Sequence, residues 1–407
     1  MLGTEIAVTG LGLVTPAGLT PEANWAALCA GRSTAAADPV LEGLPVDFSC
    51  QVTSFDAEAE LGRLTRRLDD FIQFALAAAR RAVCDAALDT HGWRAERVGV
   101  VLGIGGTSLK SYESAFQHLA TGHPSRVSPL TVPRSNPNMA AGEVAIDLGA
   151  RGPNFTVSTA CASGATAIGV ARDLLRSGTC DIVLAGGTES ARSRMTAACF
   201  ARMRALSRRR DQPGLASRPF DTARDGFVLG EGAAVLVLEP LAVARSRGAP
   251  VQALLRGYGA SADAHHPIAP HPEGRGAVQA MTTALEDAGC RPGDIGHINA
   301  HGTSTPTNDA LEAAALARVF GDQSPPVTAP KGVIGHSLGA AGAIEAAYTV
   351  LALRHASVPP VANFGAQNGD PKLDIVAGSP RPLTAGTGIS CSFGFGGQNA
   401  VLLFEAA

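Results

Sequence analysis

Residues 157–171, VSTACASGATAIGVA, set one cysteine, Cys161, among small and uncharged side chains. Small and β-prone residues precede it, and the run that follows has the apolar density of a helix buried on all sides. We therefore expect Cys161 where a strand turns into a buried helix. Backbone N–H groups lack partners at a helix start and the helix dipole favours negative charge, so the thiol should ionise readily and act as a nucleophile. The alternative is that Cys161 packs as a small hydrophobe.

The composition of the chain limits the classes of protein to which it can belong. Its 407 residues are 45% hydrophobic and 17% charged, which is typical of a soluble globular protein with two packed domains or one large double core. A net charge of -3 gives no reason to expect nucleic acid or an anionic membrane as partner. We expect neither a signal peptide nor a membrane span, because no apolar run has the required length or flanks.

The cysteines are scattered along the chain without a CxxC pair. This usage indicates reduced thiols of a cytoplasmic protein, with neither a disulfide framework nor a metal site. The eight are Cys29, Cys50, Cys84, Cys161, Cys180, Cys199, Cys290 and Cys391.

Strand-like runs such as CDIVLAGG and AAVLVLE alternate with helical stretches, which predicts an α/β layered core. The polar, Arg-rich stretch 204–231 is expected to form a long functional loop. The expected helices cover residues 69–90, 161–177, 273–289, 308–319 and 337–355.

The chain also resembles itself. Residues 89–108 align with residues 286–304, and CASGA (161–165) aligns with HSLGA (336–340). An internal duplication is therefore expected, with the halves meeting near residue 250. Cys161 and His336 would be equivalent, each at a buried helix start facing the junction of the halves, where ligand sites are favoured.

Other chemistry-bearing residues lie near the same junction. His301, in NAHGTSTPTND, is expected at a strand end, where α/β proteins present catalytic groups. Glu345 lies inside an apolar helix, where an unpaired carboxylate costs several kcal/mol, so Lys331 or a histidine should meet it. One cysteine, two histidines and a buried Lys/Glu pair indicate an active site.

Two other motifs would indicate different functions, but the surrounding sequence fits them poorly. GHSLG fits the nucleophile elbow of α/β-hydrolases with Ser337 as nucleophile. That fold needs an acid followed by a histidine, but the only later histidine, His355, precedes Asp374, and three prolines interrupt the required strand. A dinucleotide-binding reading of GLGLVTPAG fails because the third glycine is missing and Pro16 interrupts the helix start.

Taken together, four blocks resemble the signatures of the β-ketoacyl-acyl-carrier-protein synthases, especially the type II elongating enzymes and polyketide ketosynthases of the thiolase superfamily. The blocks are VSTACASG, NAHGTSTPTND, KGVIGHSLGAAGAIEA and SFGFGGQNAVLLF. The resemblance implies an α/β thiolase-like fold of two duplicated α/β halves in a five-layer α-β-α-β-α arrangement. Residues 1–250 would carry the nucleophilic cysteine and residues 251–407 the two catalytic histidines.

The resemblance also implies the chemistry. Cys161 would take an acyl chain from an acyl carrier protein, with the backbone N–H groups of Cys161 and Phe395 as oxyanion hole. His301 and His336 would stabilise the enolate that forms when malonyl carrier protein loses carbon dioxide. Lys331 and Glu345 would orient and polarise these histidines, with Asp309 and Glu312 as possible helpers.

Substrate contacts follow from the same resemblance. Thr303 and Thr305 would bind the phosphopantetheine arm, which belongs to the carrier protein, so the enzyme needs no cofactor of its own. Ile104 and Phe200 would line the acyl tunnel. Two departures put the substrate in doubt: Ile268 replaces a pantetheine-contacting threonine, and Gln398 stands where threonine is usual.

Acyl carrier proteins are acidic, so a local basic surface is expected despite the net negative charge. The resemblance places five arginines around the tunnel mouth: Arg63, Arg66, Arg67, Arg126 and Arg204. The implied partners are acyl- and malonyl-loaded carrier protein and a second subunit, in a homodimer or in a heterodimer with a chain-length-factor-like protein.

Two alternatives stay open. A non-catalytic chain-length-factor-type subunit characteristically lacks the cysteine, so Cys161 argues against it. A ketosynthase-like acyltransferase would form esters or amides without decarboxylation, and both histidines argue against that. The resemblance does not separate fatty-acid from polyketide biosynthesis.

Overall fold

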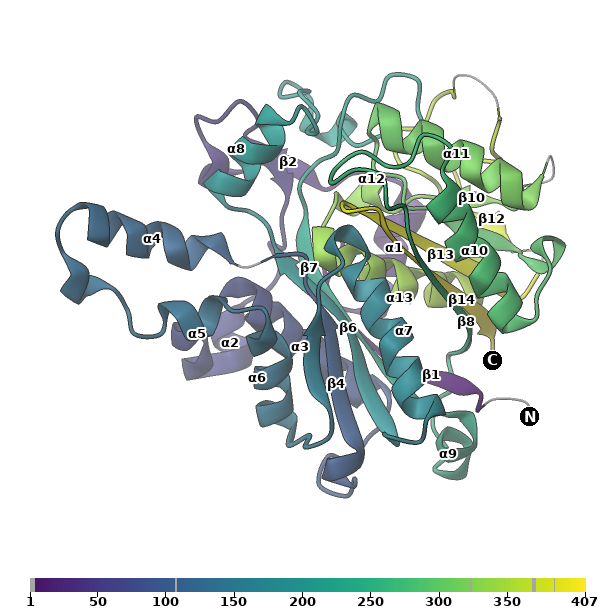
Figure 1. Ribbon diagram of the computed structural model, residues 1–407, viewed down its shortest axis with the longest axis horizontal. Helices are drawn as coiled ribbons and strands as arrows, with labels where there is room; N and C mark the ends of the chain where they lie inside the picture. The colour runs from purple at the N-terminus through teal and green to yellow at the C-terminus, as the bar shows by residue number, and fades with distance from the viewer. Residues whose placement is uncertain (1–3, 107, 322–323, 368–370, 384) are drawn as a thin grey trace.

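Two groups of five strands form the framework of the protein (Figure 1). The computed structural model describes residues 4–106, 108–321, 324–367, 371–383 and 385–407. The first group is β1 (Ile6–Val14), β4 (Val98–Gly103), β5 (Asn154–Val157), β6 (Ile182–Ser190) and β7 (Glu231–Pro240). The second is β8 (Ala253–Ala262), β9 (His297–Asn299), β10 (Val327–Thr328), β13 (Thr387–Gly394) and β14 (Gln398–Ala406).

The strand order repeats from one half to the other. All ten strands form one sheet in the order β10-β9-β13-β14-β8-β1-β7-β6-β4-β5, joined where Ile6 on β1 pairs with Leu255 on β8. Outward from this joint, each half has two antiparallel pairings followed by two parallel ones. This repetition confirms the duplicated halves.

Helices cover the strands in layers, as Figure 1 shows. In the centre, α7 (Ser163–Arg176) and α13 (Ala341–Arg354) pack against each other between the two halves of the sheet. On the outer faces, α3 (Asp70–Asp85) and α6 (Asn138–Leu148) cover the first half, while α10 (Arg275–Ala288) and α11 (Pro306–Phe320) cover the second. The result is the five-layer α-β-α-β-α arrangement of a thiolase-like fold.

No helix in the described part of the chain combines the length and hydrophobicity of a membrane span.

Further helices and strands surround these layers. The remaining elements are α1 (Pro21–Ala30), β2 (Ala35–Ala37), β3 (Phe48–Cys50), α2 (Ala57–Leu61), α4 (Leu109–Ala120), α5 (Thr131–Ser135), α8 (Arg194–Arg202), α9 (Leu241–Ser246), α12 (Lys331–Ile334), β11 (Ser357–Val358) and β12 (Arg381–Pro382).

The expected helices all form, with ends shifted by a few residues. The stretch between α8 and β7 contains one short 3₁₀ turn (Pro213–Leu215) and is otherwise loop, as predicted for residues 204–231. The predicted boundary near residue 250 falls between α9 and β8. The division into residues 1–250 and 251–407 stays a prediction.

Glycines set how closely the outer helices approach the sheet. A Cβ atom on Gly12 of β1 would lie 1.8 Å from the carbonyl oxygen of Ala78 on α3. The equivalent Gly259 of β8 would place a Cβ 2.0 Å from the carbonyl oxygen of Ala280 on α10. Backbone-to-backbone contact of this kind leaves no room for even a methyl group.

We predict that Gly12→Ala lowers the free energy of unfolding by about 3 kcal/mol, because the added methyl group overlaps a backbone carbonyl that cannot move alone. Gly142→Ala on α6 is the matched control, since a Cβ there meets no atom within 4 Å. It should raise the free energy of unfolding by about 0.5–1 kcal/mol through helix propensity. Scanning calorimetry measures both, and equal effects of the two substitutions would contradict the packing argument.

Candidate active site

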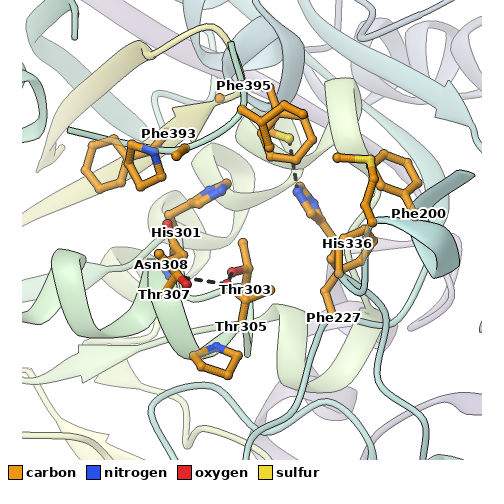
Figure 2. A pocket seen from close by; sticks show the side chains of 18 of the residues that line it. Phe200, Phe227, His301, Thr303, Thr305, Thr307, Asn308, His336, Phe393 and Phe395 are labelled. Carbon is orange, nitrogen blue, oxygen red and sulfur yellow. Dashed lines mark hydrogen bonds between the residues drawn. The ribbon is translucent and has the colours of Figure 1, made fainter. Parts of the chain in front are cut away.

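A pocket of about 420 Å³ lies at the junction of the halves and collects residues from both (Figure 2). Cys161 follows β5 of the first half, and His336 follows β10 of the second. His301 follows β9, and Phe395 follows β13. The structure therefore brings Cys161, His301, His336 and Phe395 together around one end of the pocket.

The turn that carries Cys161 is held by its own side chains. Ala160, immediately before the cysteine, adopts φ +48°, a left-handed conformation that costs a non-glycine residue about 1–2 kcal/mol. The hydroxyl of Ser163 offsets this cost, because it accepts from the Thr159 N–H at 2.9 Å and donates to the Ala160 carbonyl at 2.6 Å. Cys161 then lies in a 3₁₀ turn (Ala160–Ala162) that leads directly into α7.

The counterpart of the Cys161 turn is the 3₁₀ turn Leu338–Ala340, which leads directly into α13 as Ala160–Ala162 leads into α7. Leu338 has φ +45°, as Ala160 has φ +48°, so Gly339 and not His336 is the structural counterpart of Cys161, and the predicted equivalence of Cys161 and His336 was wrong by three residues. The His336 N–H donates to the Val228 carbonyl at 2.7 Å, which fixes the backbone just before this turn. The segment before this turn places His336 Nε2 3.2 Å from Cys161 Sγ.

The ionisation of Cys161 differs from the sequence prediction. Burial raises the pKa of this thiol to about 11, although the Lys331 charge and a hydrogen bond from the Phe395 backbone lower it. The prediction of a lowered pKa was therefore wrong, because it considered the helix start and not the depth of the site. Only 8% of the Cys161 surface is exposed, so loss of hydration outweighs the favourable charges around the sulfur.

The backbone N–H of Phe395 reaches the Cys161 sulfur. Gly394 ends β13 directly against the cysteine turn, where a Cβ atom would lie 2.6 Å from the Thr159 carbonyl oxygen and 3.1 Å from the Cys161 nitrogen. This approach brings the following amide, that of Phe395, to the sulfur. The Phe395 ring packs near Phe200, with ring centres 6.3 Å apart.

A buried lysine fixes the state of His301. The Lys331 ammonium donates to the His301 carbonyl oxygen at 2.6 Å, forms an ion pair with Glu345, and lies 3.3 Å from His301 Nδ1. An ammonium group only donates, so His301 Nδ1 must accept and the ring proton must be on Nε2. This nitrogen is the one left to donate to a ligand.

Both histidines are neutral. Burial and the Lys331 charge hold the pKa of His301 and that of His336 well below the usual range, and His336 lowers the pKa of His301 further. The two rings lie 5.4 Å apart between centres and almost perpendicular. With the proton of His336 also on Nε2, two neutral N–H donors would lie side by side and suit an oxygen that gains negative charge without being protonated.

Glu312 holds the backbone under His301. Its carboxylate accepts from the N–H of His301 at 2.7 Å and from that of Gly302 at 2.8 Å. Burial raises the pKa of Glu312 to about 7. Asp309 acts similarly one turn earlier on α11, accepting from the N–H groups of Phe220 and Ser304.

Four of the predicted substrate residues line the pocket, and the fifth lies outside its lining. Thr303 and Thr305 line the pocket with their hydroxyls hydrogen-bonded to each other at 2.9 Å, and Ile268 and Phe200 line it as well. Ile104 does not line the pocket: it is buried beneath the cysteine turn, where its carbonyl lies 3.3 Å from the Ser163 hydroxyl.

The five predicted docking arginines come from three segments of the chain. Arg204 lines the pocket. Arg63, Arg66 and Arg67 lie on a 3₁₀ helix (Gly62–Arg67) between α2 and α3, where Arg67 pairs with Glu143 at 3.2 Å. Arg126 follows α4.

Sequence reasoning missed several residues of the site. Phe227 and Phe393 pack against His336 and His301, with ring centres 5.3 and 5.9 Å apart. Asp263 and Asn399 also line the pocket and are hydrogen-bonded at 2.9 Å. A buried acid, Glu189, lies near the end of β6, and its signal was an acidic residue one position after the apolar run IVLAGG and Thr188.

Two family models of known proteins match this chain, one in each half. Residues 3–244 match the family model "Beta-ketoacyl synthase, N-terminal domain", and residues 252–365 match "Beta-ketoacyl synthase, C-terminal domain". A 3-oxoacyl-[acyl-carrier-protein] synthase 2 of Synechocystis sp. is 43% identical over 410 residues, 98% of each chain. The ishigamide ketosynthase/chain length factor superposes over 100% of both chains with a TM-score of 0.94 at 34% identity. A type II polyketide ketosynthase in complex with its acyl-carrier protein gives 0.91 at 30%, again over 100% of both chains.

We predict that alkylation of Cys161 by iodoacetamide accelerates about tenfold per pH unit between about pH 7 and pH 9.5, because only the thiolate reacts and its pKa lies above this range. Mass mapping measures the rate at each cysteine, and the exposed Cys84 and Cys199 are internal references. A plateau below pH 8 would instead support the lowered pKa that the helix start alone predicts.

Proposed function

The chain belongs to the β-ketoacyl synthase family, and we propose that it catalyses the decarboxylative Claisen condensation of malonyl carrier protein with an acyl chain held on Cys161. The observation that carries this proposal is the pairing of Cys161 Sγ with His336 Nε2 at 3.2 Å, beside a second neutral histidine whose proton is fixed by Lys331. The enzyme is an acyltransferase of the 3-oxoacyl-[acyl-carrier-protein] synthase type.

In the first half-reaction, the Cys161 sulfur attacks the thioester of an acyl carrier protein. The N–H groups of Cys161 and Phe395 receive the oxygen that becomes negative, because Gly394 lets this backbone approach the sulfur. His336 Nε2–H donates to the sulfur while it carries negative charge. The acyl–pantetheine bond breaks, and the thiol proton ends on the pantetheine sulfur that leaves.

In the second half-reaction, malonyl carrier protein binds in the emptied arm site. The C–C bond to its carboxylate breaks to release carbon dioxide, and the electron pair moves to an enolate whose oxygen accepts from His301 and His336. The enolate carbon attacks the acyl group, and the Cys161 sulfur leaves with the electron pair and then takes up one proton. Neutral donors stabilise the enolate without quenching it by protonation.

The arm site and the cofactor assignment follow from this cycle. Thr303 and Thr305 lie on the same wall of the pocket as His301 and would hold the phosphopantetheine arm. The arm belongs to the carrier protein, so the cycle requires no cofactor resident on the enzyme. The cytoplasmic location inferred from the sequence stays a proposal, supported by eight cysteines that are all free thiols.

Neither alternative explains the residues of the site as well. A non-catalytic chain-length-factor-type subunit needs no nucleophile, yet Cys161 is held in a strained turn beside His336. An acyltransferase that does not decarboxylate malonyl groups needs no second N–H donor, yet Lys331 is buried to fix the proton of His301.

A second subunit is expected at the β5 end of the sheet. This strand is the edge of the sheet, and unpaired edge backbone groups commonly pair with another chain. Large apolar side chains are exposed beside it on β5, α4, α5, α6 and the turn before α5. They are Phe116, Leu119, Leu130, Val132, Ile146 and Phe155. We propose a dimer through this face, with a second copy or with a chain-length-factor-like relative.

We predict that His301→Ala leaves acyl transfer to Cys161 within about threefold of wild type but lowers condensation about 100-fold or more. The reason is that His301 donates only to the enolate, whereas it makes no hydrogen bond to the sulfur in the described structure. Intact-mass kinetics with acyl carrier protein measure the first step, and release of carbon dioxide from malonyl carrier protein measures the second. Loss of acylation in this variant would contradict the assignment of roles.

We predict that Arg66→Glu combined with Arg204→Glu weakens the use of carrier protein about tenfold, while acylation by a small pantetheine thioester is unchanged. Both arginines are exposed, and reversing their charge repels an acidic partner. The matched control is Arg94→Glu with Arg245→Glu, which makes the same charge change at exposed positions outside the pocket lining. Wild-type turnover with carrier protein should also slow as salt rises. If both pairs of substitutions act alike, the docking face lies elsewhere.

A further inference from the structure

Glu189 is a buried carboxylate that the proposed cycle does not use. It is the penultimate residue of β6 and is 6% exposed. Its Oε2 atom accepts from the Gly105 N–H at 2.7 Å and from the Gly339 N–H at 3.2 Å. The N–H of Gly106 also donates to this carboxylate. Backbone donors therefore converge on one side chain.

These donors come from both halves of the protein. Gly105 and Gly106 follow β4 of the first half, whereas Gly339 lies in the turn after His336 of the second. The two segments touch directly, because a Cβ atom on Gly339 would lie 1.9 Å from the nitrogen of Gly105. Glu189 thus bridges the halves at a place where their backbones touch.

Each segment is connected to a reacting group through a short chain of contacts. On one side, Ile104 precedes Gly105, and its carbonyl lies 3.3 Å from the hydroxyl of Ser163, which donates to the Ala160 carbonyl at 2.6 Å and so holds the Cys161 turn. On the other side, Gly339 follows Leu338, which has φ +45° and so is strained in the turn that follows His336. A hydrogen bond at Gly339 stabilises this strained turn.

We propose that Glu189 is a positioning residue that holds the Cys161 and His336 turns together through the amides of Gly105 and Gly339, and so sets the distance between Cys161 Sγ and His336 Nε2. This inference rests on the proposed function of the pocket. A carboxylate suits the task because its hydrogen bonds to backbone N–H groups are stronger than those of a neutral acceptor.

The same carboxylate has an electrostatic effect on the nucleophile. The groups that act on Cys161 are Lys331 and the Phe395 amide, which lower its pKa, and Glu189 and Glu345, which raise it. His336 is the titratable ring in contact with the sulfur. Removing the negative charge of Glu189 should therefore lower the pKa of the thiol, an effect that loss of folding stability alone would not produce.

The test compares Glu189→Gln and Glu189→Ala with Glu239→Gln. Glu239 is a fully buried carboxylate on the neighbouring strand β7, where it pairs with Arg247 outside the pocket. The first measurement is the pH profile of Cys161 alkylation in the free enzyme, which does not depend on condensation. The second is kcat and KM with acyl and malonyl carrier protein.

Glu189→Gln keeps an acceptor oxygen but loses the charge, so it should shift the alkylation profile to lower pH and keep kcat within about threefold of wild type. Glu189→Ala removes the acceptor, so kcat should fall about tenfold or more while KM changes less than about twofold, because misplaced reacting groups cost rate rather than binding. Glu239→Gln should lower the melting temperature and leave the profile in place.

An unshifted alkylation profile in Glu189→Gln, or wild-type kcat in Glu189→Ala, would overturn the proposal. If Glu189→Ala does not fold, the profile of Glu189→Gln decides alone. If wild-type protein does not condense its substrates yet the profile of Glu189→Gln shifts, the proposed function fails and the placement of Glu189 beside the nucleophile stands.

Discussion

The direct contact between the two halves is the constraint on which the active site depends. Gly339 of the second half approaches Gly105 of the first so closely that no side chain fits between them, and a Cβ atom on Gly164 of α7 would lie only 2.6 Å from the Ala343 nitrogen of α13. Because the backbones touch, the Cys161 and His336 turns cannot shift independently. A distance of 3.2 Å between a sulfur and a ring nitrogen from different halves is maintained by this packing.

Burial then determines the charge state of every reacting group. Burial at the end of the pocket raises the pKa of the Cys161 thiol to about 11 and lowers the pKa values of His301 and His336. Lys331 is 1% exposed, and an ammonium so deeply buried is stable only because Glu345 and the His301 carbonyl surround it. The Lys331 ammonium in turn determines which nitrogen of His301 carries the proton. The site therefore does its chemistry with neutral donors and one internal ion pair.

The local sequence predicted much of this arrangement. The properties that it did not predict depend on parts of the chain that are distant in sequence. The strand–turn–helix around Cys161 was predictable because turn and helix signals are short-range, and the repeat in the chain predicted that Cys161 and His336 would meet. The repeat placed the counterpart of Cys161 at His336, whereas the structure places it at Gly339, in the 3₁₀ turn that leads into α13. The pKa of Cys161 was not predictable, since it depends on how much protein covers the sulfur. Glu189 was missed for a related reason: its side chain acts on the backbone N–H groups of Gly105 and Gly339, which lie far from it in the sequence.

The two ends of the sheet differ in a way that limits assembly. At β10, the backbone of Val327 bonds to Asp374 and Val376, so that edge is covered by the chain's own later segment. At β5, side chains are exposed and the edge is open. In the proposed dimer, the partner would cover the open β5 edge of each subunit, and neither subunit would have an edge left to offer. Assembly would then stop at a pair, and the ten-stranded sheets would not extend into a fibre.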